Sequence, residues 1–260
     1  MIIVQMIGGL GNQMFQYSLF RNFLDRGENT LYEPLETSKY HNGFELNRIF
    51  NIIENPISSM DEVKPLIRFQ ENTWPRFNSE ILNKKNTYLC GNWQNINYFP
   101  SEELLRKDFK FKQELDSKNK GILSQILESN SVSIHIRKGD YTTMPGYFFQ
   151  ADWFNYYALA INFIISKVGP AKFFIFSDDI NWAKNNMMIP ATYIQNEKKD
   201  SWKDMMLMSN CKHNIIANST FSWWAAWLNS NPRKIITTPK KWFLDGTDSN
   251  LITLNSWIKI

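Results

Sequence analysis

From residue 131 to the end of the chain, short apolar segments alternate with stretches in which apolar residues recur at helical spacing. The segments that predict strands are 132–136, 172–176, 191–194, 214–217 and 234–237. Helical spacing covers 154–167, begins again at Trp182, and continues in 204–208 and 221–228. Because strands that alternate with helices pair side by side in the same direction, this half of the chain predicts a doubly wound parallel sheet.

The first part of the chain opens with the same kind of unit. Residues 2–6 predict a strand, a glycine-rich loop follows, and residues 13–26 predict a helix that Gly27 ends as a C-cap. Residues 29–100 are less regular, apart from a predicted strand at 87–90. The polar stretch 112–120 carries little apolar periodicity and is the best linker. The expected fold class is therefore α/β, with two Rossmann-like domains, 1–129 and 130–260, facing each other across a cleft.

Composition narrows the function classes. A net charge of +4 over 260 residues is far from the dense basic stripes of a nucleic-acid binder. Two cysteines are too few for a disulfide framework or a zinc site, which favours a cytoplasmic setting. The apolar start, residues 1–7, lacks a basic region and predicts a strand rather than a leader. Any work at a membrane is then expected from its surface, on the inner face of the plasma membrane.

The glycine loop Gly8-Gly9-Leu10-Gly11-Asn12-Gln13 lies between a strand and a helix, where backbone N–H groups favour an anion. A dinucleotide fingerprint requires glycine or alanine at the position that Met14 occupies, so the sequence argues against an NAD-dependent oxidoreductase. Glu33 lies at a suitable distance for a ribose contact, but it is one acidic residue in a loop. A tight turn without any ligand is the alternative.

The strongest local signal is His135-Ile136-Arg137-Lys138-Gly139-Asp140-Tyr141, which begins within a predicted strand and continues past its carboxyl end. Ligands of open α/β sheets bind at these strand ends, and an arginine there can donate two hydrogen bonds to a phosphate. Asp140 is placed to hold Arg137 or His135 in its working orientation. The alternative is a surface salt bridge that follows a strand.

Two further segments also follow predicted strands. Ser177-Asp178-Asp179 offers adjacent carboxylates, but neighbours in extended chain point in different directions, so Asp179 as the N-cap of the next helix is the alternative to a metal. Asn218-Ser219-Thr220-Phe221-Ser222 joins a strand to a helix. Ser219 or Thr220 is expected to cap that helix, and the same hydroxyl and N–H groups would suit a phosphate.

Together these segments resemble glycosyltransferase family 11, the α-1,2-fucosyltransferases of bacteria and the related animal enzymes. The resemblance spans nearly the whole chain, and five segments carry it in order. They are Gly8 to Tyr17, Gly91-Asn92-Trp93-Gln94, His135 to Tyr141, Phe174 to Asp179, and Asn214 to Trp224. The family's basic motif usually holds two arginines, of which the first resembles Arg137, while the second position holds Lys138 here. Lysine keeps the charge but loses the planar fork.

The resemblance implies a GT-B fold, with an acceptor-side domain at 1–129 and a GDP-fucose-binding domain at 130–260. It implies inversion at the sugar carbon and no metal or other cofactor. It places Arg137 at the leaving phosphate as the catalytic residue and Asp204 at guanine or ribose. The other implied substrate-binding residues are Gly11, Asn12, Gln13, His135, Asp140, Asp178, Asn218, Ser219, Thr220 and Ser222.

The expected function is transfer of L-fucose from GDP-fucose to a hydroxyl, the 2-OH of a β-galactoside in an oligosaccharide or lipid-linked glycan. The alternatives are a protein O-fucosyltransferase-like enzyme and an inactive nucleotide-sugar-binding protein. The sequence identifies no general base. No nucleophile elbow is present, which argues against a covalent hydrolase.

Overall fold

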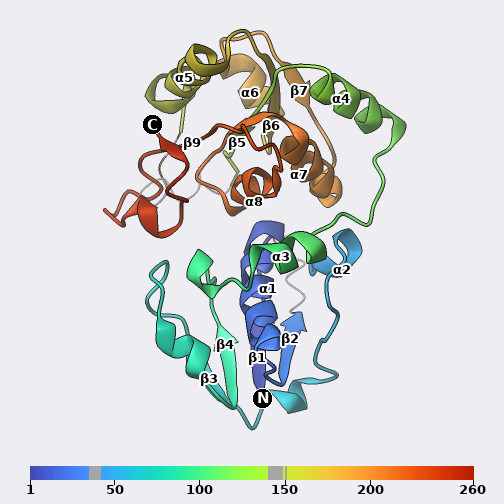
Figure 1. Ribbon diagram of the computed structural model, residues 1–260, viewed down its shortest axis with the longest axis vertical. Coiled ribbons are helices and arrows are strands. Elements are labelled where there is room, and N and C mark those ends of the chain that lie inside the picture. The colour runs from blue at the N-terminus through green and yellow to red at the C-terminus, as the bar shows by residue number, and fades with distance from the viewer. Residues whose placement is uncertain (35–41, 140–148, 150) are drawn as a thin grey trace. The chain divides into compact units, whose positions relative to one another are not determined.

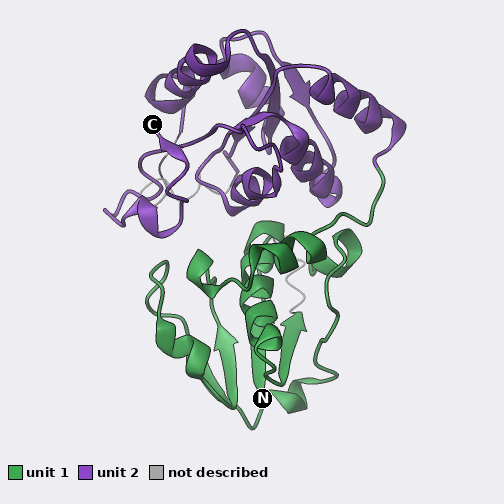
Figure 2. Ribbon diagram, viewed as in Figure 1, with its two compact units in different colours: residues 1–114 green, residues 115–260 purple. Residues whose placement is uncertain are grey.

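The computed structural model describes residues 1–34, 42–139, 149 and 151–260. The chain divides into two compact units, residues 1–114 and residues 115–260, which Figure 2 distinguishes by colour. The division falls before the helix α4, Ser117–Leu127, whereas the expected boundary follows residue 129. The physical reason is that α4 packs on the helix α7, Ser201–Asn210, and Lys203 of α7 pairs with Asp116 at 2.9 Å.

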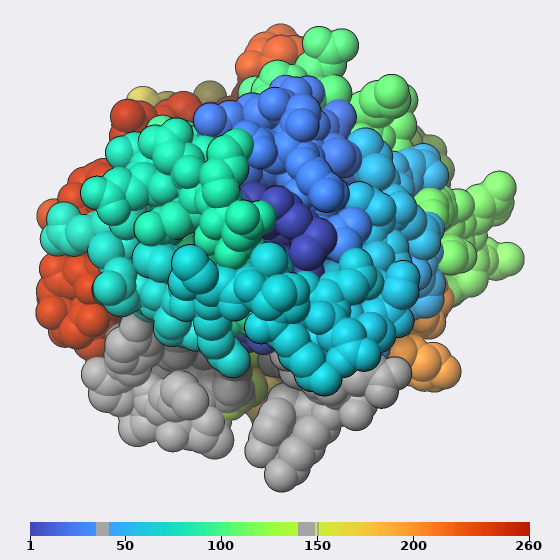
Figure 3. Space-filling model, turned by 90° about the horizontal axis from the view of Figure 1, so that it is seen from below, coloured from blue at the N-terminus to red at the C-terminus, as the bar shows by residue number. Residues whose placement is uncertain are grey.

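Unit 1 contains a four-stranded parallel sheet with the strand order β2-β1-β4-β3. The strands are β1 Ile2–Met6, β2 Thr30–Pro34, β3 Ile67–Gln70 and β4 Thr87–Cys90, and the helices are α1 Leu10–Asp25, α2 Leu46–Ile49 and α3 Glu102–Asp108. All residues of β1 and β4 are buried, which explains why their apolar runs predict them correctly. Figure 3 shows the beginning of the chain surrounded on one face by later segments of this unit.

The long helix α1 ends as the sequence predicts, at a glycine. Gly27 has a φ of +76°, a conformation that costs glycine little and other residues more. The N–H groups of Gly27 and Glu28 donate to the carbonyl oxygens of Leu24 and Phe23, both at 3.0 Å. These two bonds satisfy carbonyl groups that the end of the helix would otherwise leave without partners.

Unit 2 contains a six-stranded parallel sheet with the order β10-β9-β8-β5-β6-β7. Its strands are β5 Ser131–Ile136, β6 Lys172–Ser177, β7 Thr192–Ile194, β8 His213–Ile215, β9 Ile236–Thr238 and β10 Ile258–Lys259. Helices α5, Ala158–Val168, and α6, Ile180–Asn186, pack on one face. On the other face, α7 contacts β8 and α8, Thr220–Leu228 (Figure 1).

The core of unit 2 shows why the alternation in the sequence is so regular. Val132, Ile134 and Ile136 of β5 point to one side and pack with Ile161 and Ile164 of α5. Successive side chains of a strand face opposite ways, so Ser131, Ser133 and His135 face the other side of β5, where they are also buried. The prediction of a doubly wound parallel sheet is confirmed.

Among the described residues, none of the helices combines the length and the apolar character that crossing a bilayer requires.

Candidate functional site

The strand order in the sheet of unit 2 reverses between β5 and β8. From β5 the chain continues through β6 to β7, whereas β8, β9 and β10 extend on the other side of β5. The loops that follow β5 and β8 therefore diverge at the carboxyl edge of the sheet, which is where open α/β sheets bind ligands. Arg137 follows β5, and Asn218, Ser219 and Thr220 follow β8, so the topology brings two of the predicted segments to this point.

Asp178 holds the loop that carries Arg137. The Asp178 Oδ2 atom lies 3.0 Å from the Arg137 Nη1 atom and also accepts the Gly139 N–H at 3.0 Å. The Asp178 Oδ1 atom accepts the Lys138 N–H at 2.9 Å. One carboxylate thus receives one guanidinium and two backbone donors, and it orients the arginine at the end of β5. Asp140, the expected partner, lies outside the described residues.

Two neighbours of Arg137 show why the loop has this sequence. A Cβ atom at Gly139 would lie 2.5 Å from the Asp178 Oδ2 atom, closer than real Cβ contacts, so a side chain there would open the contact with Asp178. The Lys138 Nζ atom lies 4.1 Å from the centre of the Trp182 ring, in a cation–π contact. Lys138 therefore packs on α6, a role that needs positive charge but no planar fork.

His135 lies at the end of β5 with its ring buried. Burial lowers the pKa of His135 to about 3, with a further contribution from the charge of Arg137, so the ring is neutral at physiological pH. Its ring is 5.6 Å from that of Phe221 in the first turn of α8, and its Nδ1 atom has no hydrogen-bond partner among the described residues. His135 can therefore donate or accept one hydrogen bond but cannot neutralise a phosphate charge.

The start of α8 differs from the expected cap. Ser219 occupies the N-cap position, as the sequence predicts, but its side chain makes no capping hydrogen bond. Thr220 is partly exposed as the first residue of the helix. The Asn218 Nδ2 atom donates to the Trp242 carbonyl at 2.8 Å, and the buried Ser222 hydroxyl bonds to backbone carbonyls. Asn218 and Ser222 thus shape the segment that leads into the helix.

Asp204 lies in the first turn of α7, near the carboxyl end of β7. Burial raises the pKa of the Asp204 carboxyl to about 7, although the Asn196 Nδ2 atom donates to its Oδ1 atom at 2.7 Å. Asn119 of α4 bonds to Asn196 in turn, at 3.0 Å. Sequence reasoning missed Asn196 and Asn119, and the only signal was an asparagine two residues after a predicted strand.

The adjacent carboxylates of Asp178 and Asp179 have separate partners. The Asp179 Oδ1 atom accepts the Trp182 N–H at 2.9 Å and caps α6, which confirms the alternative interpretation of this residue. In the residues that the structure places, no group of three or more His, Cys, Asp or Glu side chains could hold a metal ion.

In unit 1, the glycine loop is packed by the chain's own amides. The Gln13 Nε2 atom donates to the carbonyls of Gly8 and Gly43, at 2.9 and 2.8 Å, and its Oε1 atom accepts the Glu45 N–H at 2.9 Å. Gln13 is buried and its amide bonds to three backbone groups, so it holds the loop together. Gly11 is buried in the first turn of α1.

The glycine loop also joins the segment after β4. The Gln94 Nε2 atom donates to the Asn12 Oδ1 atom at 3.0 Å, and the Gln16 Nε2 atom donates to the Gly91 carbonyl at 2.9 Å. Two of the five resembling segments therefore form one hydrogen-bonded structure in unit 1. Asn12 is partly exposed, which leaves a ligand contact open to it.

Comparison with known proteins identifies the family. Glycosyl transferase family 11 matches residues 1–260, so the chain belongs to this family. The O-antigen biosynthesis glycosyltransferase WbnK of Escherichia coli is 31% identical, over 97% of this chain and 98% of that protein. An alpha-1,2-colitosyltransferase of Escherichia coli is 33% identical, over 93% and 92%. Human galactoside alpha-(1,2)-fucosyltransferase 1 is 25% identical, over 61% of this chain and 48% of that enzyme.

Solved structures agree on the fold. NodZ alpha-1,6-fucosyltransferase, co-crystallized with GDP, matches with a TM-score of 0.52 at 15% identity, over 86% of this chain and 91% of that one. POFUT1 in complex with GDP-fucose matches with a TM-score of 0.51 at 14% identity, over 90% and 96%. The chain therefore has the GT-B type of fold, with two Rossmann-like parts, as the sequence predicts.

Proposed function

We propose that this member of glycosyltransferase family 11 transfers L-fucose from GDP-fucose to the 2-OH of a β-galactoside, with inversion at the sugar carbon. The acceptor hydroxyl attacks C1 of fucose, the C1–O bond to the β-phosphate breaks, and GDP leaves. The proton of the hydroxyl passes to a base that the described residues do not identify. The alternatives are a protein O-fucosyltransferase-like enzyme and an inactive nucleotide-sugar-binding protein.

The arrangement around Arg137 carries the proposal. Negative charge grows on the β-phosphate as the sugar leaves, so catalysis needs fixed donors at that oxygen. Asp178 holds Arg137 in place at the point where the strand order of the sheet reverses. The first turn of α8 begins beside Ser219, whose side chain makes no capping hydrogen bond. A diphosphate between these groups would receive a guanidinium and helix N–H donors.

Asp204 is our candidate for recognition of the base. Guanine presents neighbouring N–H and NH₂ donors, which a carboxylate can accept as a pair. Asn196 already orients one oxygen of Asp204 and leaves the other for a ligand. Binding of such donors favours the charged carboxylate and would lower its raised pKa.

No metal enters the proposed reaction. Arg137 and the N–H groups of α8 supply the positive charge at the leaving diphosphate, and the oxygens of Asp178 and Asp179 serve loop and helix contacts. We therefore expect catalysis without a cofactor.

The similarity to one relative makes GDP-colitose a second candidate donor. The alpha-1,2-colitosyltransferase is among the more similar proteins, and colitose is fucose without the 3-hydroxyl. A site that hydrogen-bonds a hydroxyl rejects the analogue lacking it by about 10⁴–10⁵, whereas an apolar pocket discriminates weakly. The ratio of kcat/KM for GDP-fucose and GDP-colitose therefore decides between the two donors.

The test is incubation of the full chain with each donor and a panel of free and lipid-linked galactosides and a serine- or threonine-bearing peptide. The proposal expects fucose on a galactoside, with an α-1,2 linkage by NMR. Transfer to the peptide alone, or no transfer to any acceptor while GDP-fucose binds, would support one of the alternatives. We expect the transferase to act in the cytoplasm, and to attach to the inner face of the plasma membrane when the acceptor is lipid-linked.

A further inference from the structure

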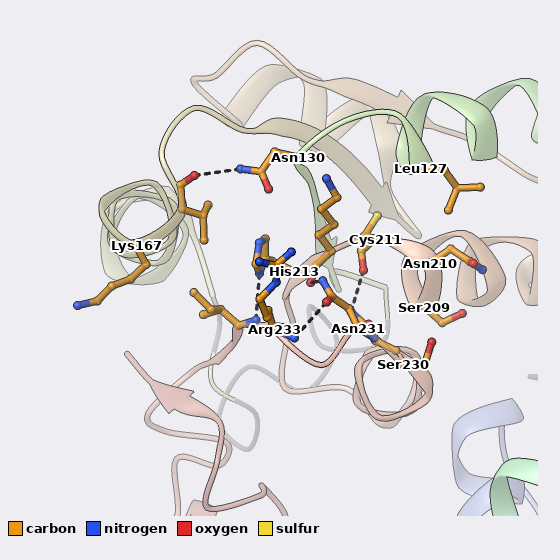
Figure 4. A pocket seen from close by; sticks show the side chains of 14 residues that line it. Leu127, Asn130, Lys167, Ser209, Asn210, Cys211, His213, Ser230, Asn231 and Arg233 are labelled. Carbon is orange, nitrogen blue, oxygen red and sulfur yellow. Dashed lines mark hydrogen bonds between the residues drawn. The ribbon is translucent and has the colours of Figure 1, made fainter.

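A pocket of about 620 Å³ lies at the other end of the sheet of unit 2. Its lining includes Asn130, His213 and Ile235, which stand at or directly before the first residues of β5, β8 and β9 (Figure 4). Arg137, Asp178 and Ser219 follow the last residues of their strands. Because the strands are parallel, the pocket and the candidate site lie at opposite edges of one sheet.

The pocket is positively charged. Lys167 at the end of α5, Lys212 before β8 and Arg233 before β9 line it, and none of its lining residues is acidic. Among the ion pairs of the described residues, these three cations have no carboxylate partner, whereas Lys203 on α7 has two. All three side chains are exposed at the rim. An anion is the ligand that this charge would attract.

A buried imidazole adds a directed donor. His213 is 95% buried, and its Nδ1 atom accepts the Ile235 N–H at 3.0 Å. The neutral ring then carries its proton on the Nε2 atom, because the other nitrogen is an acceptor. No described residue accepts from this Nε2–H, and the ring lines the pocket. Burial lowers the pKa of His213, which keeps the ring neutral until an anion binds.

Exposed apolar side chains flank the basic pocket. Leu127, at the end of α4, lines it and is 59% exposed. Ile165 is also exposed and lies on α5 two residues before Lys167, which lines the pocket. Figure 4 shows Leu127 and Lys167 on opposite sides of the opening. A soluble anion would gain nothing from these side chains, whereas a lipid surface would cover them.

We propose that this pocket binds the phosphate headgroup of an anionic phospholipid and attaches unit 2 to a membrane surface. Lys212, Arg233 and the His213 Nε2–H hold the phosphate, and Leu127 enters the interface beside it. Surface binding of this kind adds apolar burial to attraction for anionic lipid. The site is separate from the candidate active site, so it does not depend on the donor or acceptor proposed above.

The test is sedimentation of the full chain with vesicles of phosphatidylcholine, or of phosphatidylcholine and phosphatidylglycerol in equal amounts. Wild type should bind only the anionic vesicles. Each cation near such a surface contributes about fivefold to partitioning, so Lys212→Gln with Arg233→Gln should weaken binding by about 25-fold. The control, Lys110→Gln with Lys184→Gln, removes two exposed positive charges outside the pocket and should have a smaller effect.

Leu127→Gln tests the apolar contact without a change of charge, and should weaken vesicle binding while the melting temperature is kept. Equal loss in the pocket variant and the control would mean unspecific attraction and would overturn the proposal. A second result would also overturn the proposal. If vesicles do not bind while glycerol phosphate raises the melting temperature in a Lys212-dependent way, the pocket is a site for a soluble phosphate. Transfer to a soluble acceptor should be unchanged in all these variants.

Discussion

Replacing Asp178 by asparagine tests how Arg137 is held. The carboxylate accepts the Arg137 Nη1 atom at 3.0 Å and the N–H groups of Lys138 and Gly139 at 2.9 and 3.0 Å. Asparagine keeps one acceptor oxygen and presents an NH₂ group to at least one of these donors. A lost hydrogen bond to a charged group costs about 1.5–3 kcal/mol. At the transition state this free energy corresponds to a fall in kcat of about 10- to 150-fold.

The assay is steady-state transfer by Asp178→Asn, Arg137→Ala and the double variant, with melting temperatures measured in parallel. Because Asp178 acts through Arg137, the double variant should lose little more than Arg137→Ala alone. Gly139→Ala, whose Cβ would lie 2.5 Å from the Asp178 Oδ2 atom, should lower kcat in the same way without a change of charge. Fully additive losses would mean that Asp178 contacts the ligand itself, and a folded Asp178→Asn protein with unchanged kcat would refute its positioning role.

Five further results are expected. Arg137→Ala should lower the rate by about 10²–10³ at an unchanged melting temperature, and Arg137→Lys should recover little. Turnover of folded Arg137→Ala within a few-fold of the parent would contradict the mechanism. Lys138→Arg should be tolerated, since the contact of Lys138 with Trp182 needs only a cation. GDP and GDP-fucose should raise the melting temperature, and an equal effect of UDP would remove guanine recognition. Transfer should survive excess EDTA, and its loss with recovery on adding Mn²⁺ would mean that a metal is needed. The pKa of Asp204, raised to about 7, means that the folded state binds a proton more tightly than the unfolded chain. Its contribution to stability is present below about pH 4 and lost as the pH rises through 7, so Asp204→Asn should flatten the fall in melting temperature between about pH 4 and pH 7.

The sequence predicts unit 2 better than unit 1 for a physical reason. Helices cover both faces of its sheet, so β6 is an apolar run, and β5 is buried throughout with apolar residues at alternate positions. In unit 1, the edge strand β3 has mostly exposed residues, and β2 ends with Glu33 and Pro34. The sequence of neither segment shows the alternation or the apolar run that predicts a strand. The segments that resemble family 11 lie outside these two strands, and the match of the family over residues 1–260 confirms the resemblance.

The candidate site could be predicted only in part. Strand ends place Arg137, Asp178 and Ser219, but which carboxylate pairs with Arg137 depends on the register of β5 against β6, which pairs Ile136 with Ser177. The polar stretch 112–120 is typical of a linker, yet Asn119 within it lies in α4 and is fully buried against Asn196. Such contacts join residues 77 positions apart, which local patterns cannot predict.

The amide of Gln13 has a consequence for anyone who would redesign this enzyme. Both of its donors and its acceptor serve backbone groups of the glycine loop and of Gly43 and Glu45. Glutamate or methionine there would leave buried carbonyl or N–H groups without partners, so a randomised library at this position should yield mostly unstable protein. A library that aims at new donors or acceptors should instead vary the partly exposed Asn12, one residue earlier.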